Sequence, residues 1–275
     1  MEWSKLKNII ILILLLVNLF LLAMAGVQQR DSAQYQEQAL ADAVTVLERN
    51  GIRLAEENIP EQMKIRSMTV QRDRELESTL AADLLGECLV SDMGSGRYSY
   101  ESTIGSAEFR SNGNFSIVFS EPIPIVQGVG GEVSHALEIA ERLGLGGVIS
   151  EQKVLDGGGV NVVLYQAWQG NPVYSCQIML QYKDGNLCSL SGQRLMGEPL
   201  PVNSGETLIS VPTALVRFLN GINDMGDICG EILEMRPGYQ MANPAEGTRM
   251  EPVWYIVTDT GAYQLNAITG ILERA

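Results

Sequence analysis

The sequence predicts an α+β protein: an N-terminal transmembrane helix followed by an ectodomain of helix-plus-antiparallel-sheet modules, the last two of which form an internal repeat. Three observations predict this fold class. A long apolar run opens the chain, short amphipathic helices alternate with groups of short strands, and one order of elements occurs twice toward the end.

The apolar run predicts a transmembrane helix over residues 9–26. These residues are apolar apart from Asn18, and a helix of this length extends about 25 Å, which nearly crosses the hydrocarbon layer of a bilayer. Lys5 and Lys7 precede the run. The positive-inside rule therefore places residues 1–8 in the cytoplasm as a short tip and the rest of the chain on the outer side of the cell membrane.

A cleaved signal peptide is the alternative to an anchor, because Ala23-Met24-Ala25 has the form of a cleavage site. The run is longer than the usual apolar region of a signal peptide, which favours the anchor. Under either interpretation the bulk of the protein is exported.

Asn18 is the polar residue inside the run. An amide in hydrocarbon costs free energy unless it is hydrogen bonded, and a neighbouring transmembrane helix can supply the partner for a gain of about 0.6–2 kcal/mol. A bond to the backbone of its own helix is the other interpretation. The residues alone leave both open.

The first module spans residues 30–125 and begins with two helices. Helix 32–50 has an apolar stripe and ends before Gly51, and helix 74–85 has Asp73 as its N-cap and Gly86 as its stop. Strands are predicted at residues 63–70, 97–101, 106–110 and 114–120, with a hairpin turn at Asn112-Gly113. The run Glu121-Pro122-Ile123-Pro124 is predicted to end the last strand and to mark a module boundary.

The second module (128–200) and the third (203–275) repeat one order of elements. The second has helix 132–143, strand 160–168 and a hairpin that turns at Asp184-Gly185; the third has helix 210–220, strand 228–236 and a hairpin that turns near Thr260-Gly261. Each hairpin opens with a proline, Pro172 and Pro252, so the two copies are 80 positions apart. Pro212 fits the third module if it lies in the first turn of its helix.

Composition and motifs argue against nucleic-acid binding and against catalysis. The formal net charge is −14, so most of the chain would repel a phosphate backbone. No CxxC, HExxH or nucleophile motif accompanies the single histidine, His135. We therefore expect no enzyme activity, no cofactor and no metal site, and we interpret His135 as a solvated surface residue.

The four cysteines, Cys88, Cys176, Cys188 and Cys229, are isolated in the sequence. In a hairpin that turns at Asp184-Gly185, Cys176 is predicted to lie opposite Gln193 and Cys188 opposite Gln181. This register places the two cysteines on opposite faces of the sheet, which disfavours a disulfide bond between them.

The opening of the chain resembles the YycI family of membrane-anchored regulators. The similarity rests on Glu2-Trp3-Ser4-Lys5-Leu6-Lys7, the apolar run, and Asn18-Leu19-Phe20-Leu21 near its outer end. The stretch that begins Pro252-Val253-Trp254-Tyr255 also resembles the terminal hairpin of PepSY-like modules.

The resemblance implies a regulatory adaptor of a two-component sensor histidine kinase of the WalK (YycG) type in a Gram-positive cell envelope. The implied partners are that kinase and a YycH-like single-pass protein. Four residues are then expected to contact them at the membrane: Trp3, Lys5, Lys7 and Asn18. The alternative function is a PepSY-like module that binds or inhibits an extracellular peptidase or binds an envelope ligand.

Overall fold

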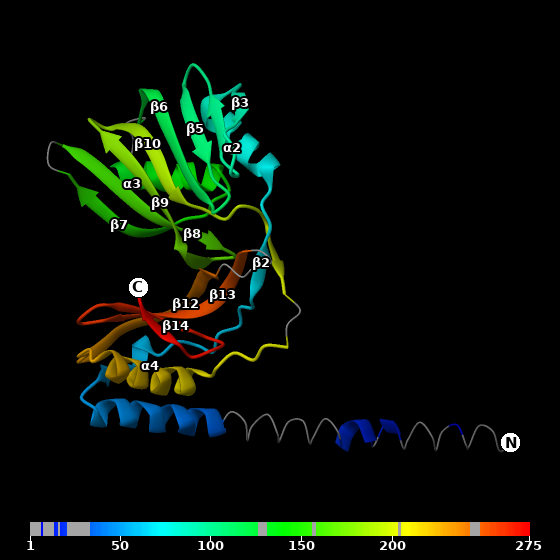
Figure 1. The fold of residues 1–275 in the computed structure, drawn as a ribbon. Coiled ribbons are helices and arrows are strands. Elements are labelled where there is room, and N and C mark those ends of the chain that lie inside the picture. Colours follow the sequence, from blue (N-terminus) through cyan, green and yellow to red (C-terminus); the bar gives the residue numbers. More distant parts are fainter. Residues whose placement is uncertain are drawn as a thin grey trace.

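The computed structural model describes residues 7, 14–15, 17–20, 34–125, 131–155, 158–202, 205–242 and 248–275. Within these residues the chain is α+β, as predicted, and its strands join into one 15-stranded sheet. The sheet belongs to two lobes (Figure 1). We call the described residues of 72–197 the upper lobe and those of 34–70 and 199–275 the lower lobe.

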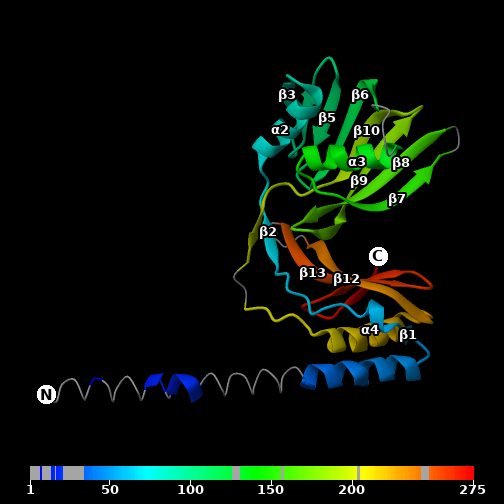
Figure 2. The ribbon, with the colours of Figure 1, turned by 180° about the vertical axis from the view of Figure 1, so that it is seen from behind.

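The upper lobe is an eight-stranded antiparallel sheet with two helices on one face. Its strands lie in the order β7 (Val148–Val154), β8 (Gly159–Trp168), β9 (Asn171–Lys183), β10 (Asn186–Gln193), β6 (Asn114–Pro124), β5 (Gly105–Phe109), β4 (Tyr98–Glu101) and β3 (Leu89–Asp92). Helices α2 (Arg74–Leu85) and α3 (Gly131–Arg142) cover one face, which Figure 2 shows.

Strand β6 shows why that face is covered. Phe115, Ile117 and Phe119 alternate with exposed residues, and all three are buried in the cluster that includes the apolar residues of α2 and α3. Burying a side chain of this size contributes about 1.5–3 kcal/mol. The alternation of apolar and polar residues in β6 thus gives the strand one buried face and one solvent-exposed face.

The lower lobe has two layers of helix under its sheet. Residues 34–49 are helical, and α4 (Val211–Met225) lies between that helix and the strands (Figure 1). The strands are β12 (Glu231–Ala242), β13 (Thr248–Thr258), β14 (Ala262–Asn266) and β15 (Leu272–Arg274), with the short β1 (Arg53–Leu54) beside β12 and a short 3-10 helix at Glu56–Asn58. Ala43 and Leu47 join Phe218 and Trp254 in one buried cluster.

The two lobes are joined by a pair of connecting strands and by contacts of β9 with the lower lobe. Strands β2 (Met68–Val70) and β11 (Pro199–Pro201), which enter and leave the upper lobe, pair with each other. Strand β9 pairs in parallel with β12 at Val173 and Tyr239. Tyr174 of β9 also stacks on Tyr255 of β13, with ring centroids 4.2 Å apart.

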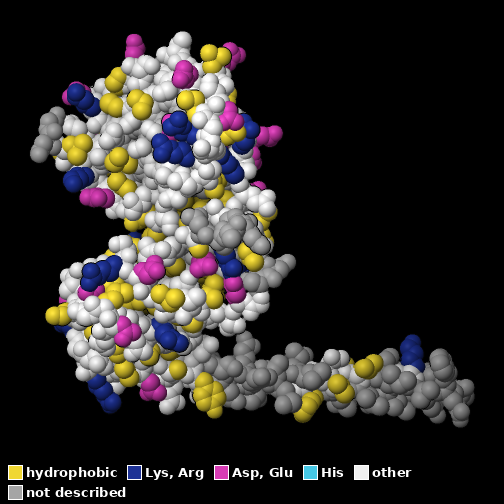
Figure 3. Space-filling view, viewed as in Figure 1, with side chains coloured by type: hydrophobic (Ala, Val, Ile, Leu, Met, Phe, Trp, Pro, Cys, Tyr) yellow, Lys and Arg dark blue, Asp and Glu magenta, His cyan; other side chains and the backbone are white. Residues whose placement is uncertain are grey.

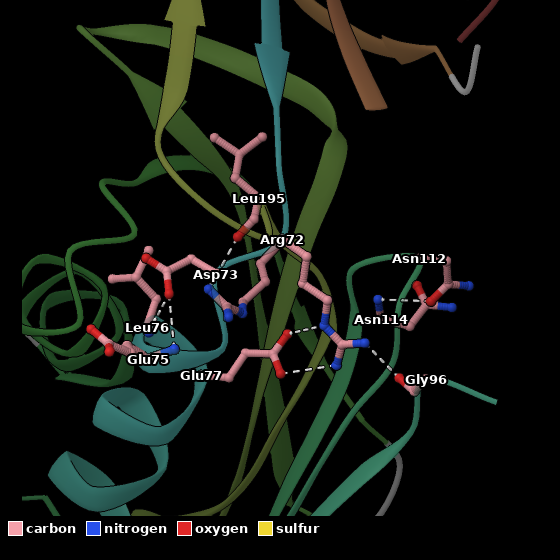
Figure 4. Close-up of polar contacts among 10 residues, drawn as sticks. Arg72, Asp73, Glu75, Leu76, Glu77, Gly96, Asn112, Asn114 and Leu195 are labelled. Atoms are coloured by element: carbon pink, nitrogen blue, oxygen red, sulfur yellow. Dashed lines mark hydrogen bonds and ion pairs between the residues drawn. The ribbon is translucent and has the colours of Figure 1, made fainter. Parts of the chain in front are cut away.

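The predicted starts of α2 and α4 are confirmed. One side-chain oxygen of Asp73 accepts hydrogen bonds from the backbone N–H groups of Glu75 (2.8 Å) and Leu76 (3.4 Å), and Gly86 follows the last turn (Figure 4). Ser210 caps α4, and Pro212 lies in its first turn, where the missing N–H needs no partner.

The predicted end of a strand at residues 121–124 is wrong, because β6 continues to Pro124. Val118 pairs with Ser189 of β10 and Ile123 pairs with Leu187, so residues 119–122 bulge out of the ladder with β10. A proline in a bulge needs no ladder hydrogen bond. Pro122 therefore lies in the bulge, and Pro124 pairs with Asn186 as the last residue of β6.

The same irregularity corrects the cysteine register. Gln181 lies opposite Ser189, and Cys188 lies within the register shift between Leu187 and Ser189. All four cysteines are free thiols in the structure. Strand 63–70 is also shorter than predicted, since only β2 is regular, and the sequence pattern missed β3 and β7.

The buried clusters cut across the predicted modules 30–125, 128–200 and 203–275. One cluster combines residues between 80 and 190, and another combines helix 34–49 with residues between 205 and 272. A helix followed by four consecutive antiparallel strands occurs three times: α2 with β3–β6, α3 with β7–β10, and α4 with β12–β15. The predicted strand 228–236 corresponds to β12.

Candidate partner-binding surface

Two of the four predicted membrane-contact residues, Trp3 and Lys5, lie outside the described residues, as does much of 9–26. Lys7 is helical and exposed. Residues 14–15 and 17–20 are also helical, and their apolar side chains are about half exposed. In the described part of the chain, no helix combines the length and the apolar character that crossing a bilayer requires.

Asn18 bonds to its own helix in this structure. Its side-chain N–H donates to the backbone oxygen of Leu14 at 2.9 Å. This is one of the two interpretations of the buried amide. A backbone bond uses only one donor of the amide, so a contact with a neighbouring helix remains a prediction.

The second face of the upper sheet is the broadest candidate surface. Among the described residues no helix crosses this face, which is the side turned to the viewer in Figure 1. We call it the open face. Two rows of side chains cross it on β6, β10, β9 and β8: Val118, Ser189, Gln181 and Asn161 in one row, and Ser116, Ser191, Met179 and Val163 in the other.

The eight open-face residues carry no charge, although the chain as a whole is strongly acidic. Ser189 donates to the side-chain oxygen of Gln181 at 2.8 Å, and the amide of Asn161 donates to the sulfur of Met179 at 3.4 Å. Figure 3 shows scattered hydrophobic side chains on this side of the upper lobe, with groups of charged side chains among them. Covering such a surface removes few charges from water, so its desolvation cost is low.

Charged residues flank these rows on both neighbouring strands, since Lys153 and Glu151 of β7 lie opposite Asn161 and Val163, and Glu108 lies on β5. Glu108 lies opposite Ser116 and pairs with Arg110 at 2.8 Å, and both side chains are exposed. An exposed pair of this kind contributes about 0–1 kcal/mol. It therefore marks the margin of the open face without stabilising the lobe much.

The two edges of the upper sheet differ in how they face solvent. At β7 the edge carries Glu151 and Lys153 and has a register irregularity, both of which discourage further strand pairing. At β3 the exposed residues include Leu89 (78% exposed) and Val90 (53%). On the β3 side the sheet thus ends in a strand with two exposed apolar residues beside Ser91 and Asp92.

His135 is not the solvated surface residue that the sequence predicts. It is half buried on α3, and its Nδ1 lies 3.1 Å from the hydroxyl of Tyr182 on β9. Burial lowers the pKa of His135, partly offset by the charge of Glu138. The sequence placed it one position off the apolar stripe, but a long tyrosine reaches it from the sheet.

In the part of the chain that the structure describes, the possible metal ligands do not come together in a site. No group of three or more His, Cys, Asp or Glu side chains gathers there. Burial raises the pKa of the Cys176 thiol to about 12, so this thiol stays protonated at neutral pH. The open face, which sequence motifs did not mark, remains the main candidate surface.

Comparisons with known proteins give little to add. No family model matches the chain, and no curated protein matches it. A solved structure of an uncharacterized protein from Eubacterium rectale aligns with 82% of this chain and 86% of its own, at 12% sequence identity and a TM-score of 0.47. A likeness of this size does not establish a shared fold.

Proposed function

We propose that the chain is a membrane-anchored, extracytoplasmic regulatory adaptor that binds a two-component sensor histidine kinase and acts through protein–protein contacts. The observation that carries the proposal is the open face: a wide, uncovered sheet surface whose eight central residues are uncharged, in a chain of net charge −14. An adaptor needs no catalytic group. It needs only a higher affinity for one state of the kinase than for the other.

The membrane part of the proposal comes from the sequence. Residues 9–26 would anchor the chain, and Trp3, Lys5, Lys7 and Asn18 would contact the kinase or a YycH-like single-pass protein. The exposed helical residues among 14–20 are compatible with lipid or a neighbouring helix.

We also propose that the helix-plus-four-strand segments descend from one repeated unit. The recurrent order of α3 with β7–β10 and of α4 with β12–β15 supports this idea. Repetition would supply two similar scaffolds, of which the upper one has the open face.

Co-purification from membranes tests the function. The wild-type chain should recover a sensor histidine kinase and a second single-pass protein. Val118→Lys places a charge in the open face and should reduce this recovery about tenfold or more, because an unpaired charge in an interface costs several kcal/mol. The matched control is Val216→Lys on α4, whose side chain is also partly exposed (39%, against 51% for Val118) and which should leave recovery unchanged.

Equal recovery with both lysine variants would refute the assignment of the open face. Recovery of a peptidase or a glycan in place of a kinase would favour the alternative function of a PepSY-like binding module. Asn18→Leu tests the membrane contact separately, since it removes the amide and keeps the apolar run. Unchanged kinase output and unchanged recovery in that variant would remove Asn18 from the proposal.

A further inference from the structure

A cavity of about 440 Å³ lies at the base of the upper lobe. It is bounded by α2, by the end of α3, by the end of β8 and by the segment that connects β10 to β11. Its polar lining includes Arg194, Trp168, Gln166, Arg142, Asp83 and Glu198. None of the functions proposed above uses this cavity.

Arg194 is the unusual residue of the lining, because it is a charged side chain with only 5% exposure. One guanidinium nitrogen donates to the backbone oxygen of Leu195 at 3.0 Å, and the guanidinium carbon lies 5.3 Å from the centre of the Phe109 ring. The other terminal nitrogen, Nη2, is buried and has no hydrogen-bond partner among the described residues.

The nearby carboxylate of Glu77 acts on Arg194 only through its charge, because its hydrogen bonds go to Arg72. Glu77 accepts hydrogen bonds from Arg72 with both oxygens, at 2.8 and 2.9 Å, and Arg72 also donates to the backbone oxygen of Gly96 at 2.7 Å (Figure 4). Within the described residues no carboxylate lies at ion-pair distance from Arg194. A guanidinium does not deprotonate in proteins, so this charge is buried without a counter-ion of its own.

Trp168 supplies a second unsatisfied donor to the same lining. Its indole N–H is buried and has no acceptor among the residues that the structure describes. Gln166, in contrast, is engaged, because its side-chain oxygen accepts from the backbone N–H of Leu195 at 2.8 Å. Two residues of the lining therefore each have a buried donor that lacks an acceptor, and one of these donors is cationic.

We propose that this cavity binds a small carboxylate, whose oxygens accept hydrogen bonds from Arg194 and from Trp168. A carboxylate matches the planar donor pair of a guanidinium and supplies the missing negative charge. Asp83 and Glu198 also line the cavity and would repel a dianion. Phosphate is therefore a poorer ligand than a monocarboxylate, and an amino group on the ligand is tolerated.

Calorimetric titration of the full chain in detergent tests the site. The probes are acetate, L-alanine, the dipeptide Ala-Ala, the C-terminal amide of that dipeptide, and inorganic phosphate. We expect at least one carboxylate to bind, with the amide and phosphate binding at least tenfold more weakly. Preference for Ala-Ala over L-alanine would identify a peptide C-terminus as the source of the carboxylate, and the reverse would identify a free acid.

Two variants locate the binding. Arg194→Met keeps an unbranched side chain and removes the guanidinium with its charge, and it should abolish carboxylate binding. Trp168→Phe keeps an aromatic ring and removes the indole N–H, and it should weaken binding about three- to tenfold, as the loss of one hydrogen bond does. Arg53→Met, at an exposed ion pair in the lower lobe, is the control and should bind as the wild type does.

Three results would overturn the proposal. They are no carboxylate binding by the folded wild type up to about 10 mM, unchanged binding by Arg194→Met, and tighter binding of phosphate than of any carboxylate. If Arg194→Met does not fold, the graded loss expected for Trp168→Phe decides the matter, and an unchanged affinity in that variant refutes the site.

Discussion

The two lobes use the same elements in different proportions. In the lower lobe α4 is enclosed between the sheet and helix 34–49, so one helix is packed on two sides. In the upper lobe α2 and α3 form a single layer, and the opposite face of the sheet stays open. In the lower lobe both helices are therefore used for internal packing. In the upper lobe one face of the sheet stays available for contact with a partner.

The largest expected effect comes from opening the lower core. Phe218 is fully buried in α4, and Phe218→Ala should cost about 3–5 kcal/mol of the free energy of unfolding. The largest core cluster of each lobe is separate from that of the other, although two smaller clusters join the lobes. Hydrogen exchange should therefore rise most in α4 and β12–β14, while α3 and the parts of β8–β10 in the upper core keep their protection. The reciprocal control is Phe115→Ala in the upper lobe, and equal loss of protection in both lobes would show one cooperative unit.

A slightly smaller effect is expected from the buried ion pair of the upper lobe. Glu77 is 1% exposed, and Glu77→Ala leaves Arg72 without its carboxylate, which should cost about 3 kcal/mol. The lower lobe offers the contrasting pair, Arg53 with Glu231, whose side chains are 77% and 36% exposed. Glu231→Ala should cost less than about 1 kcal/mol in the same denaturant titration. Similar costs for the two variants would contradict this assignment of burial.

The helix caps should behave alike in both lobes. Asp73→Ala removes an acceptor for two N–H groups of α2, and Ser210→Ala removes the one that serves Thr213 in α4. Each should cost about 0.5–2 kcal/mol, measured by urea unfolding. A cost near zero for one cap would show that its helix is held by packing alone.

The smallest effect concerns the pH dependence of the upper lobe. Burial lowers the pKa of His135 below its unfolded value, so the unfolded chain binds more protons than the native chain as the pH falls from about 6.5. Stability therefore falls with falling pH in this window. His135→Gln should make unfolding less dependent on pH between about 7 and 5. An unchanged slope would mean that His135 titrates alike in both states.

Local signals in the sequence predicted the local structure well. Asp73 and Gly86 bound α2 because capping chemistry depends on neighbours in the sequence. Asp184-Gly185 turns the hairpin between β9 and β10 for the same reason, with Asp184 at φ 52° and Gly185 at φ 72°.

The features that could not be predicted from the sequence depend on residues that are far apart along the chain. The bulge that accommodates Pro122 exists because β10 pairs on both sides of it, and the burial of Arg194 depends on elements far along the chain. Neither alternation nor a motif marks such residues. The open face is legible in part, since small and amide side chains alternate with apolar ones in β6, β9 and β10.

The pairing of β2 with β11 has a consequence for the order of folding. The chain leaves the lower lobe at Val70 and re-enters it at Pro199, which pairs with Val70. Helix 34–49 packs in one cluster with α4, and α4 is synthesised only after the whole of the upper lobe. The helix therefore has no partner to bury its apolar side chains until α4 is present. The upper lobe can collapse from contiguous sequence, so we expect the lower core to close last and its early helix to remain without a packing partner until then.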